Sequence, residues 1–274
     1  MDFETVIYER VGPIAVVTLD RPDVRNAQNA KLLQELDAAY RTAEKDLDVR
    51  VVVLKANGKH FSAGHDMSQP EIDRYEQEVR RGQDGVAPQY DWERENYLEL
   101  TQRWRDIPKP TIAAVHGKCI AGGLMLAWAC DLIMASDDAE FCDPVARMGI
   151  GGVEYHAHTW EVGHRKAKEM LFTGGYIGAL EAQQLGMVNH VVPRAELESR
   201  TMELANRIAK TDPFGLRMSK LAVNRTLDIM GQRNAMAAIF DLHHMAHANS
   251  RLEHAGDSVG GHDVKSMKAA AGGG

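Results

Sequence analysis

Four continuous apolar runs constrain the fold more than any other feature of this sequence. The runs are IAVVTL (14–19), VRVVVLKA (49–56), TIAAVHG (111–117) and CDLIMAS (130–136), and they lack polar alternation. Such strands are typical of a sheet that is covered on both faces. Residues 5–10 add a partner for a hairpin with the first run, and helical patterns separate the later runs. Repeated alternation of strands and helices predicts an α/β fold.

The remainder of the chain is mainly helical from about residue 162, apart from one short predicted strand, MVNHVVP. We predict an α/β core over 1–195, a helical C-terminal region over 196–255, and a flexible tail over 256–274 that has little to bury. A polar insertion at about 68–96 is either a solvated loop and helix or a flap beside a site. Its aromatic residues could close over a bound acyl group: Tyr75, Tyr90, Trp92 and, just beyond it, Tyr97.

Composition excludes several classes of partner. The net charge is −7, and no Lys/Arg block is present, so we expect no nucleic acid partner. No apolar run approaches the roughly 20 residues that span a bilayer, and the acidic N-terminus does not resemble a secretion signal. We therefore expect a cytoplasmic protein without a membrane partner. The three cysteines lack zinc or disulfide spacing and are expected to be buried thiols.

Two stretches carry residues suited to chemistry. KHFSAGHDMS (59–68) follows a predicted strand and places Ala63 and Gly64 where backbone can approach a ligand. In HGKCIAGGLMLAWACD (116–131), Gly122 and Gly123 begin a short helix whose first N–H groups are free. Two such N–H groups could stabilise one developing oxyanion, each contributing about 3 kcal/mol. Taken separately, the small residues of either stretch could also serve only the close packing of the backbone.

The pair, in this order and with IPKPTIAAVHG before the second stretch, resembles the crotonase, or enoyl-CoA hydratase/isomerase, family. RPDVRNA, VVVLKANGKHFSAGHD and LFTGGYIGALEAQQLGMVNHVVP extend the resemblance over roughly residues 5–225. It implies a crotonase-like (ClpP/crotonase) spiral of β-β-α units with a helical C-terminal region that forms homotrimers or dimers of trimers. It also implies an acyl-CoA thioester substrate, no metal, and no cofactor beyond the coenzyme A of the substrate.

The resemblance also assigns binding residues. The oxyanion-hole donors would be the N–H groups of Ala63 and Gly122. The turn from Gly64 through His65 and Asp66 to Met67 would lie along adenine and pantetheine. Asp66 could instead serve as a turn cap. The nucleotide would also contact Val24, Arg25 and Asn26, with Arg25 and Lys59 as possible partners of its phosphates.

The sequence departs from the family pattern at both hydratase glutamates. The corresponding positions, which line the same pocket, hold Met125 and Val145. An apolar side chain cannot act as a general base. The usual hydratase reaction therefore lacks both of its glutamates, and the isomerase reaction, which needs only the second glutamate, lacks that one at Val145.

The segment GIGGVEYHAHTW brings new polar groups to this rim. If it is helical, Glu154 and His158 share a face at i,i+4 and could act as an acid–base pair, with His156 beside them. Surface polarity at a helix start is an equally good explanation. Asp143 is expected to be a turn or cap residue, with a catalytic role as the alternative. Packing or a subunit contact is expected for the histidines of a C-terminal helix: His243, His244 and His247.

Three functions are compatible with these residues. The leading hypothesis is an enoyl-CoA hydratase/isomerase family enzyme, a lyase or isomerase, that holds a thioester enolate and uses non-standard acid/base residues. The alternative is a non-catalytic acyl-CoA-binding protein that has kept the fold, which the replaced glutamates would explain. A Ser-His-Asp hydrolase finds little support, because neither Ser62 nor Ser68 lies in a GxSxG-like elbow.

Overall fold

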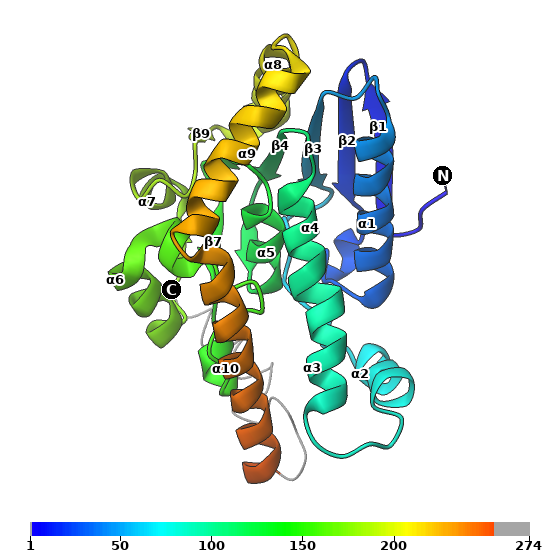
Figure 1. The fold of residues 1–274 in the computed structure, drawn as a ribbon, viewed down its shortest axis with the longest axis vertical. Coiled ribbons are helices and arrows are strands. Elements are labelled where there is room, and N and C mark those ends of the chain that lie inside the picture. The colour runs from blue at the N-terminus through cyan, green and yellow to red at the C-terminus, as the bar shows by residue number, and fades with distance from the viewer. Residues whose placement is uncertain (1, 255–274) are drawn as a thin grey trace.

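A computed structural model describes residues 2–254 and shows the predicted α/β core (Figure 1). Its main sheet has the order β1-β2-β3-β4-β6-β9, with β1 and β2 antiparallel and all other neighbours parallel. The strands are β1 (Val6–Val11), β2 (Ile14–Leu19), β3 (Val51–Ala56), β4 (Thr111–Val115), β6 (Leu132–Ser136) and β9 (His190–Val192). The hairpin and the apolar strands expected from the sequence are therefore confirmed.

Both faces of this sheet are covered, which explains the continuous apolar strands. In β2, Ala15, Val17 and Leu19 face α1 (Ala30–Lys45) in the larger core, whereas Ile14 and Val16 face the opposite way. The second face is covered by α8 (Leu197–Ala209). The first helix of the predicted C-terminal region thus packs against the sheet of the core.

Helix α1 begins where its sequence predicts. Asn29 is the N-cap, and its side chain accepts a hydrogen bond of 2.9 Å from the N–H of Leu32. The apolar face of α1 then buries Leu32, Leu36 and Tyr40 against the sheet.

A second, three-stranded sheet was not predicted. It consists of β5 (Lys118–Ile120), β7 (Glu140–Cys142) and β8 (Ile177–Gly178), with β7 between the other two. These strands have only two or three residues, too few for a periodicity to be recognised. Helix α5 (Gly122–Trp128) follows β5 directly, and η4 (Val145–Met148) follows β7.

The polar insertion is mostly helical. It contains α2 (Gln69–Tyr75) and the π-helical η2 (Glu76–Arg80), and it continues through α3 (Ala87–Glu93) into the π-helical η3 (Arg94–Glu99) and α4 (Leu100–Asp106). The last three run without interruption beside the C-terminal helix (Figure 1). Of the aromatic residues singled out from the sequence, Tyr97 is buried, and its ring contacts Trp92 edge to face.

The rest of the described chain is helical, as predicted. Its elements are α6 (His158–Thr173), α7 (Ala179–Gln184), η5 (Arg194–Glu196), α8, α9 (Pro213–Ile229) and α10 (Gln232–Glu253). The predicted tail at 256–274 lies outside the described residues. Over residues 2–254, no helix is both long and apolar enough to cross a bilayer. Cys119, Cys130 and Cys142 are buried free thiols, as expected.

Candidate functional site

The two glycine-containing stretches lie side by side. Ser62 pairs with Cys119 in a parallel bridge, and its C=O accepts a hydrogen bond of 3.0 Å from the N–H of Ile120. Gly64 has a φ of +89°, and a Cβ placed there would lie 2.9 Å from the Ile120 carbonyl oxygen and 3.3 Å from the Gly122 nitrogen. Only glycine fits this position, because both the conformation and the space exclude a side chain.

The first expected oxyanion donor is not free. The N–H of Ala63 donates to the carbonyl of Arg25 at 3.0 Å. The N–H of Gly64 donates to Ser62 Oγ at 3.3 Å, so the next donor to consider is His65. Gln28 bonds both to the Gly64 carbonyl and to the Asp66 N–H, so the His65 N–H faces away from Gln28, toward the side where β5 lies. The assignment of the first donor to Ala63 therefore does not fit the structure.

The second expected donor is available. Ala121 precedes α5 with a φ of 48°, and Gly122 is the first residue of that helix. Among residues 2–254, no hydrogen bond occupies the N–H of His65 or that of Gly122. Two unbonded amides therefore lie on adjacent turns.

The His65 side chain lies over Gly122. A Cβ at Gly122 would be 2.7 Å from the His65 Cε1 and 2.9 Å from its Nδ1. The ring stacks on Tyr97 with 3.9 Å between centroids, and its Nε2 lies 3.0 Å from Glu154 Oε2. Its Nδ1 is buried without a hydrogen-bond partner.

Burial and charge oppose each other at this His–Glu pair. Burial alone would lower the pKa of His65, but the charge and hydrogen bond of Glu154 outweigh it and raise that pKa. Burial alone would raise the pKa of Glu154, but the charge and hydrogen bond of His65 outweigh it, so this pKa is lowered. Each partner therefore favours the charged form of the other.

The predicted pairing of Glu154 with His158 is wrong. Helix α6 begins only at His158, so the two residues do not share a helical face. His158 instead places its Nε2 2.8 Å from Asp143 Oδ2, and both side chains are fully buried. Asp143 also accepts N–H bonds from Val145 and Val153, as a turn residue does.

His156 is buried beside this pair. Its ring lies 4.3 Å from that of His158 and fills the space where Gly152 has no side chain. Burial, followed by the nearby His158, lowers the pKa of His156 to about 4. The structure thus brings Glu154 to the turn of Gly64 and His65, whereas His156 and His158 lie together beside Asp143.

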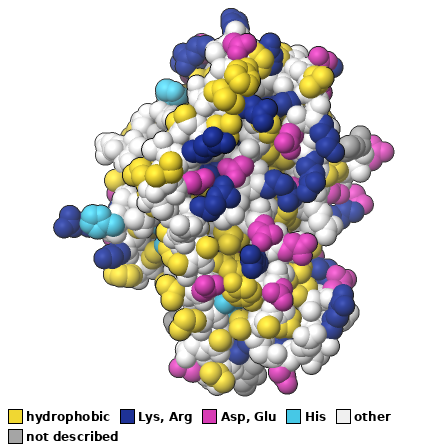
Figure 2. Space-filling view, viewed as in Figure 1, with side chains coloured by type: hydrophobic (Ala, Val, Ile, Leu, Met, Phe, Trp, Pro, Cys, Tyr) yellow, Lys and Arg dark blue, Asp and Glu magenta, His cyan; other side chains and the backbone are white. Residues whose placement is uncertain are grey.

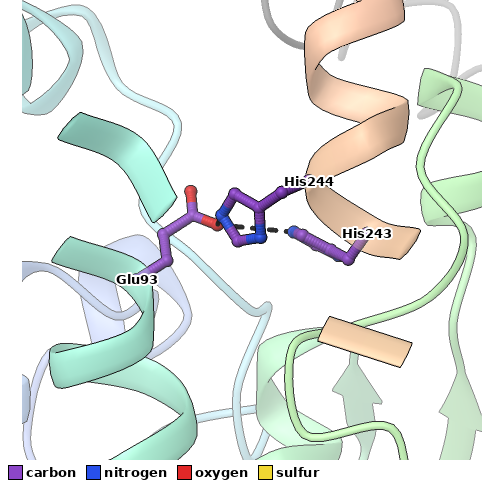
Figure 3. A group of neighbouring side chains, drawn as sticks. All are labelled: Glu93, His243 and His244. Atoms are coloured by element: carbon purple, nitrogen blue, oxygen red, sulfur yellow. Dashed lines mark ion pairs between the residues drawn. The ribbon is translucent and has the colours of Figure 1, made fainter. Parts of the chain in front are cut away.

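A group of ionisable side chains that the sequence did not connect is drawn in part in Figure 3, and one of its members, His243, lies 3.6 Å from Glu154. We call it the Glu93 cluster; it consists of Glu93, His243, His244 and His247, all buried. Glu93 comes from the insertion, which had seemed solvated, and the histidines come from α10. The i,i+4 spacing of His243 and His247 could have indicated that these two side chains share a helical face. No residue near them in the sequence indicates that Glu93 is their partner.

The residues expected around a nucleotide form an exposed loop region. Val24, Arg25, Lys59 and Met67 are exposed, whereas Asn26 is fully buried. The Asn26 amide bonds only to Arg21, Asn57 and His60, so it supports the loop.

Asp66 acts as the turn cap proposed as its alternative role. Its Oδ1 accepts the N–H of Ser68 at 3.1 Å, and its Oδ2 lies 2.9 Å from Arg21 Nη1. These contacts fix the turn that carries Gly64 and His65.

Four cations surround His60 at the edge of the same loop region. Burial and then the charges of nearby residues lower the pKa of His60; these residues are Lys59, Arg25, Lys118 and Arg194. Arg194 and Lys118 form ion pairs with Asp138 and Glu140, whereas Arg25 and Lys59 have no ion-pair partner among residues 2–254. These two exposed cations suit a phosphate-bearing ligand.

Met125 and Val145 are both buried, in α5 and at the start of η4. They contribute no ionisable group to the site. Proton transfer by a side chain at this site therefore has to come from other residues.

Comparisons with known proteins agree with this architecture. A family model described as enoyl-CoA hydratase/isomerase matches residues 9–258. EchA13 of Mycobacterium tuberculosis, described as a candidate enoyl-CoA hydratase, is 46% identical over 273 residues, covering 95% of this chain and 84% of that protein. The short-chain-enoyl-CoA hydratase of Clostridium acetobutylicum is 36% identical and covers 82% of this chain and 83% of its own.

A crystal structure of a probable enoyl-CoA hydratase from Mycobacterium smegmatis superposes with a TM-score of 0.87. It is 52% identical and covers 93% of this chain and 98% of its own. The chain belongs to the enoyl-CoA hydratase/isomerase family and has the crotonase fold. The resemblance found in the sequence is confirmed at this level.

Proposed function

We propose that this enzyme binds an acyl-CoA thioester and stabilises its enolate through the N–H groups of His65 and Gly122. The observation that carries the proposal is the pair of unbonded amides on adjacent turns. A thioester oxygen between them gains negative charge as the enolate forms, and preorganised donors stabilise that charge more than the neutral carbonyl.

Proton transfer is assigned to the His65 side chain, supported by Glu154. The Nε2 of His65 is bonded to Glu154, which leaves Nδ1 for the substrate. Because Nδ1 lies over Gly122, it can exchange a proton with a carbon next to a thioester carbonyl held there. This assignment needs neither Met125 nor Val145 to be acidic.

The coenzyme A part of the substrate would follow the exposed loop region. The cations around His60 would meet its phosphates, and Met67 and Val24 would contact its less polar parts. This arrangement keeps the proposed substrate contacts of Arg25 and Lys59 and omits a side-chain contact for Asn26.

An association of three copies, or of two such trimers, is proposed for the apolar face of α9 and α10. Helix α9 buries none of its residues, and hydrophobic side chains mark the path of these helices in Figure 2. The most exposed are Phe214, Val223, Ile229, Met230, Leu242, Met245 and Leu252. Such a patch is typical of an interaction surface, and light scattering of the purified chain measures the mass of the assembly.

The test mixes the purified protein with crotonyl-CoA and follows the loss of enone absorbance, beside a calorimetric titration with acetoacetyl-CoA. Turnover above the buffer rate, together with acetoacetyl-CoA binding, supports the enzyme. Binding without turnover of any enoyl-, dienoyl- or β-ketoacyl-CoA would instead establish the non-catalytic acyl-CoA-binding alternative. Absence of binding to all these thioesters contradicts both.

A further inference from the structure

The Glu93 cluster gathers three potential ligand atoms around one point, from Glu93, His243 and His244, and His247 lies beside them. Glu93 Oε2 lies 3.2 Å from His244 Nε2, 3.4 Å from His243 Nε2 and 3.8 Å from His247 Nε2. The Nε2 atoms of His243 and His247 are 2.9 Å apart. Ligands about 2.0–2.2 Å from a tetrahedral ion are separated by about 3.4 Å, so these spacings are those of a metal ligand set.

Hydrogen bonds to the backbone fix which nitrogen faces the centre. His243 donates from Nδ1 to the Gly152 carbonyl at 2.8 Å, and His244 donates from Nδ1 to the Phe240 carbonyl at 3.0 Å. A carbonyl can only accept, so both Nδ1 atoms carry their proton, and a neutral ring then has its lone pair on Nε2. Metal-ligating histidines show this same pattern, in which the outer nitrogen is tied to a carbonyl.

The carboxylate is oriented in a comparable way. Glu93 Oε1 accepts a hydrogen bond of 2.8 Å from Gln89, whose own Oε1 accepts one from Arg251. Glu93 Oε2 and His244 Nε2 are buried and make no hydrogen bond. A buried carboxylate oxygen facing imidazole lone pairs is unfavourable unless a cation lies between them.

The local electrostatics favour a positive charge. Glu93 Oε2 lies 3.2–3.8 Å from the Nε2 atoms of all three histidines, so a cation among these atoms would be attracted to the carboxylate at short range. Protons or a metal ion could supply this charge.

We propose that Glu93, His243 and His244, with His247 as a fourth ligand, bind one divalent transition-metal ion of the zinc type. Imidazole nitrogens with a single carboxylate suit Zn²⁺ and its neighbours Co²⁺ and Ni²⁺, whereas Mg²⁺ and Ca²⁺ prefer oxygen ligands. The i,i+4 histidines of α10 present two ligands on one helical face, as in helical zinc sites. The carboxylate of α3 completes the set from a neighbouring element.

The ion would join the insertion to the C-terminal helix. Figure 3 shows Glu93 on α3 pointing toward His243 and His244 on α10. His243 Nε2 also lies 3.6 Å from Glu154 Oε1, the carboxylate bonded to His65. Metal binding would therefore hold α3 and α10 together directly behind the proposed acid–base pair. The binding itself does not depend on that catalytic assignment.

The experiment uses tag-free full-length protein from which metal has been removed with a chelator. Zn²⁺ is titrated against a competing fluorescent chelator, and Co²⁺ is added separately to record its visible absorption. We expect one equivalent of Zn²⁺ per chain and the intense Co²⁺ bands of a four-coordinate site. Because metal displaces ligand protons, binding at neutral pH should also release protons into weakly buffered solution.

The variants are Glu93→Gln, which can keep the bond to Gln89, and His244→Ala, with His164→Ala on the surface of α6 as the matched control. Loss of a ligand should weaken Zn²⁺ binding by at least about 100-fold, since loss of an outer-shell partner already costs 10–100-fold. The control should bind like the unmodified chain. Circular dichroism checks that each variant is folded.

Two results overturn the proposal. If the unmodified protein binds neither Zn²⁺, Co²⁺ nor Ni²⁺ with one-to-one stoichiometry, the cluster is balanced by protons alone. If folded Glu93→Gln and His244→Ala bind Zn²⁺ as tightly as His164→Ala, the ion binds elsewhere. The result for the unmodified chain decides the question even if a variant fails to fold.

Discussion

His65 and Glu154 lie 89 positions apart in the sequence, yet their side chains meet at 3.0 Å beside the backbone of Gly122. The contact joins the turn after β3 to the loop that precedes α6. It brings an imidazole and a carboxylate to the place where the two unbonded amides lie. Met125 and Val145 bring no ionisable group to this place, so this contact is the basis of the proposed chemistry.

Removing either member of the pair should reduce catalysis. We expect His65→Ala and Glu154→Gln to lower turnover of the accepted enoyl-CoA by about 10²–10⁴-fold, the range for a lost acid or base. Acetoacetyl-CoA binding should persist, because His65→Ala retains the backbone N–H. The comparison is with His164→Ala, which is exposed. Turnover equal to that of this control in both variants would show that the proton passes through another group.

Gly122→Ala tests the close approach of the His65 ring to the amide turn. The new Cβ would meet the ring at 2.7 Å, so the ring must move. A displacement of about 1 Å can cost about 10²-fold in rate, and we expect a loss of that size in kcat/KM. Gly178→Ala is the control, because no atom lies within 4 Å of its added Cβ. Equal rates for the two variants would contradict this packing.

Asp143 should contribute to stability. Asp143→Ala leaves His158 buried without its partner and removes acceptors for two backbone N–H groups. Loss of one member of a buried pair costs about 3–5 kcal/mol, so the urea midpoint should fall sharply. Arg200→Ala, which breaks an exposed ion pair with Glu203, should change stability by no more than about 1 kcal/mol. A similar small change for Asp143→Ala would show that the buried pair is dispensable.

Stability should decline in mild acid, partly because of His156. Its pKa is lowered to about 4 in the folded chain, against about 6.5 when unfolded, so the unfolded state binds more protons between these values. This contribution is fully present above pH 6.5 and is lost as the pH falls toward 4, by up to about 3 kcal/mol. Urea unfolding at several pH values should therefore show a smaller decline for His156→Gln. An unchanged decline would mean that folding does not lower the pKa of His156.

Local sequence determined the main elements of this protein. Apolar runs identified β2, β3, β4 and β6, because a strand that is buried on both faces consists of consecutive apolar residues. The start of α1 also depends on a local contact, because the Asn29 side chain caps the turn that follows it. Gly64 and Gly122 indicated backbone that approaches other groups closely. The family could also be identified, since its motifs consist of such contiguous residues.

Only the tertiary structure decided which groups act together. The N–H of Ala63 is taken by Arg25, nearly forty positions earlier, and this could not be read from the residues around it. Glu154 faces His65 and Asp143 faces His158, because the chain from 149 to 157 is not helical and local spacing does not apply. Glu93 meets His243 and His244 only because α3 packs against α10. Hydrogen-bond direction and ionic partners depend on contacts between distant segments, whereas periodicity and capping act within a few residues.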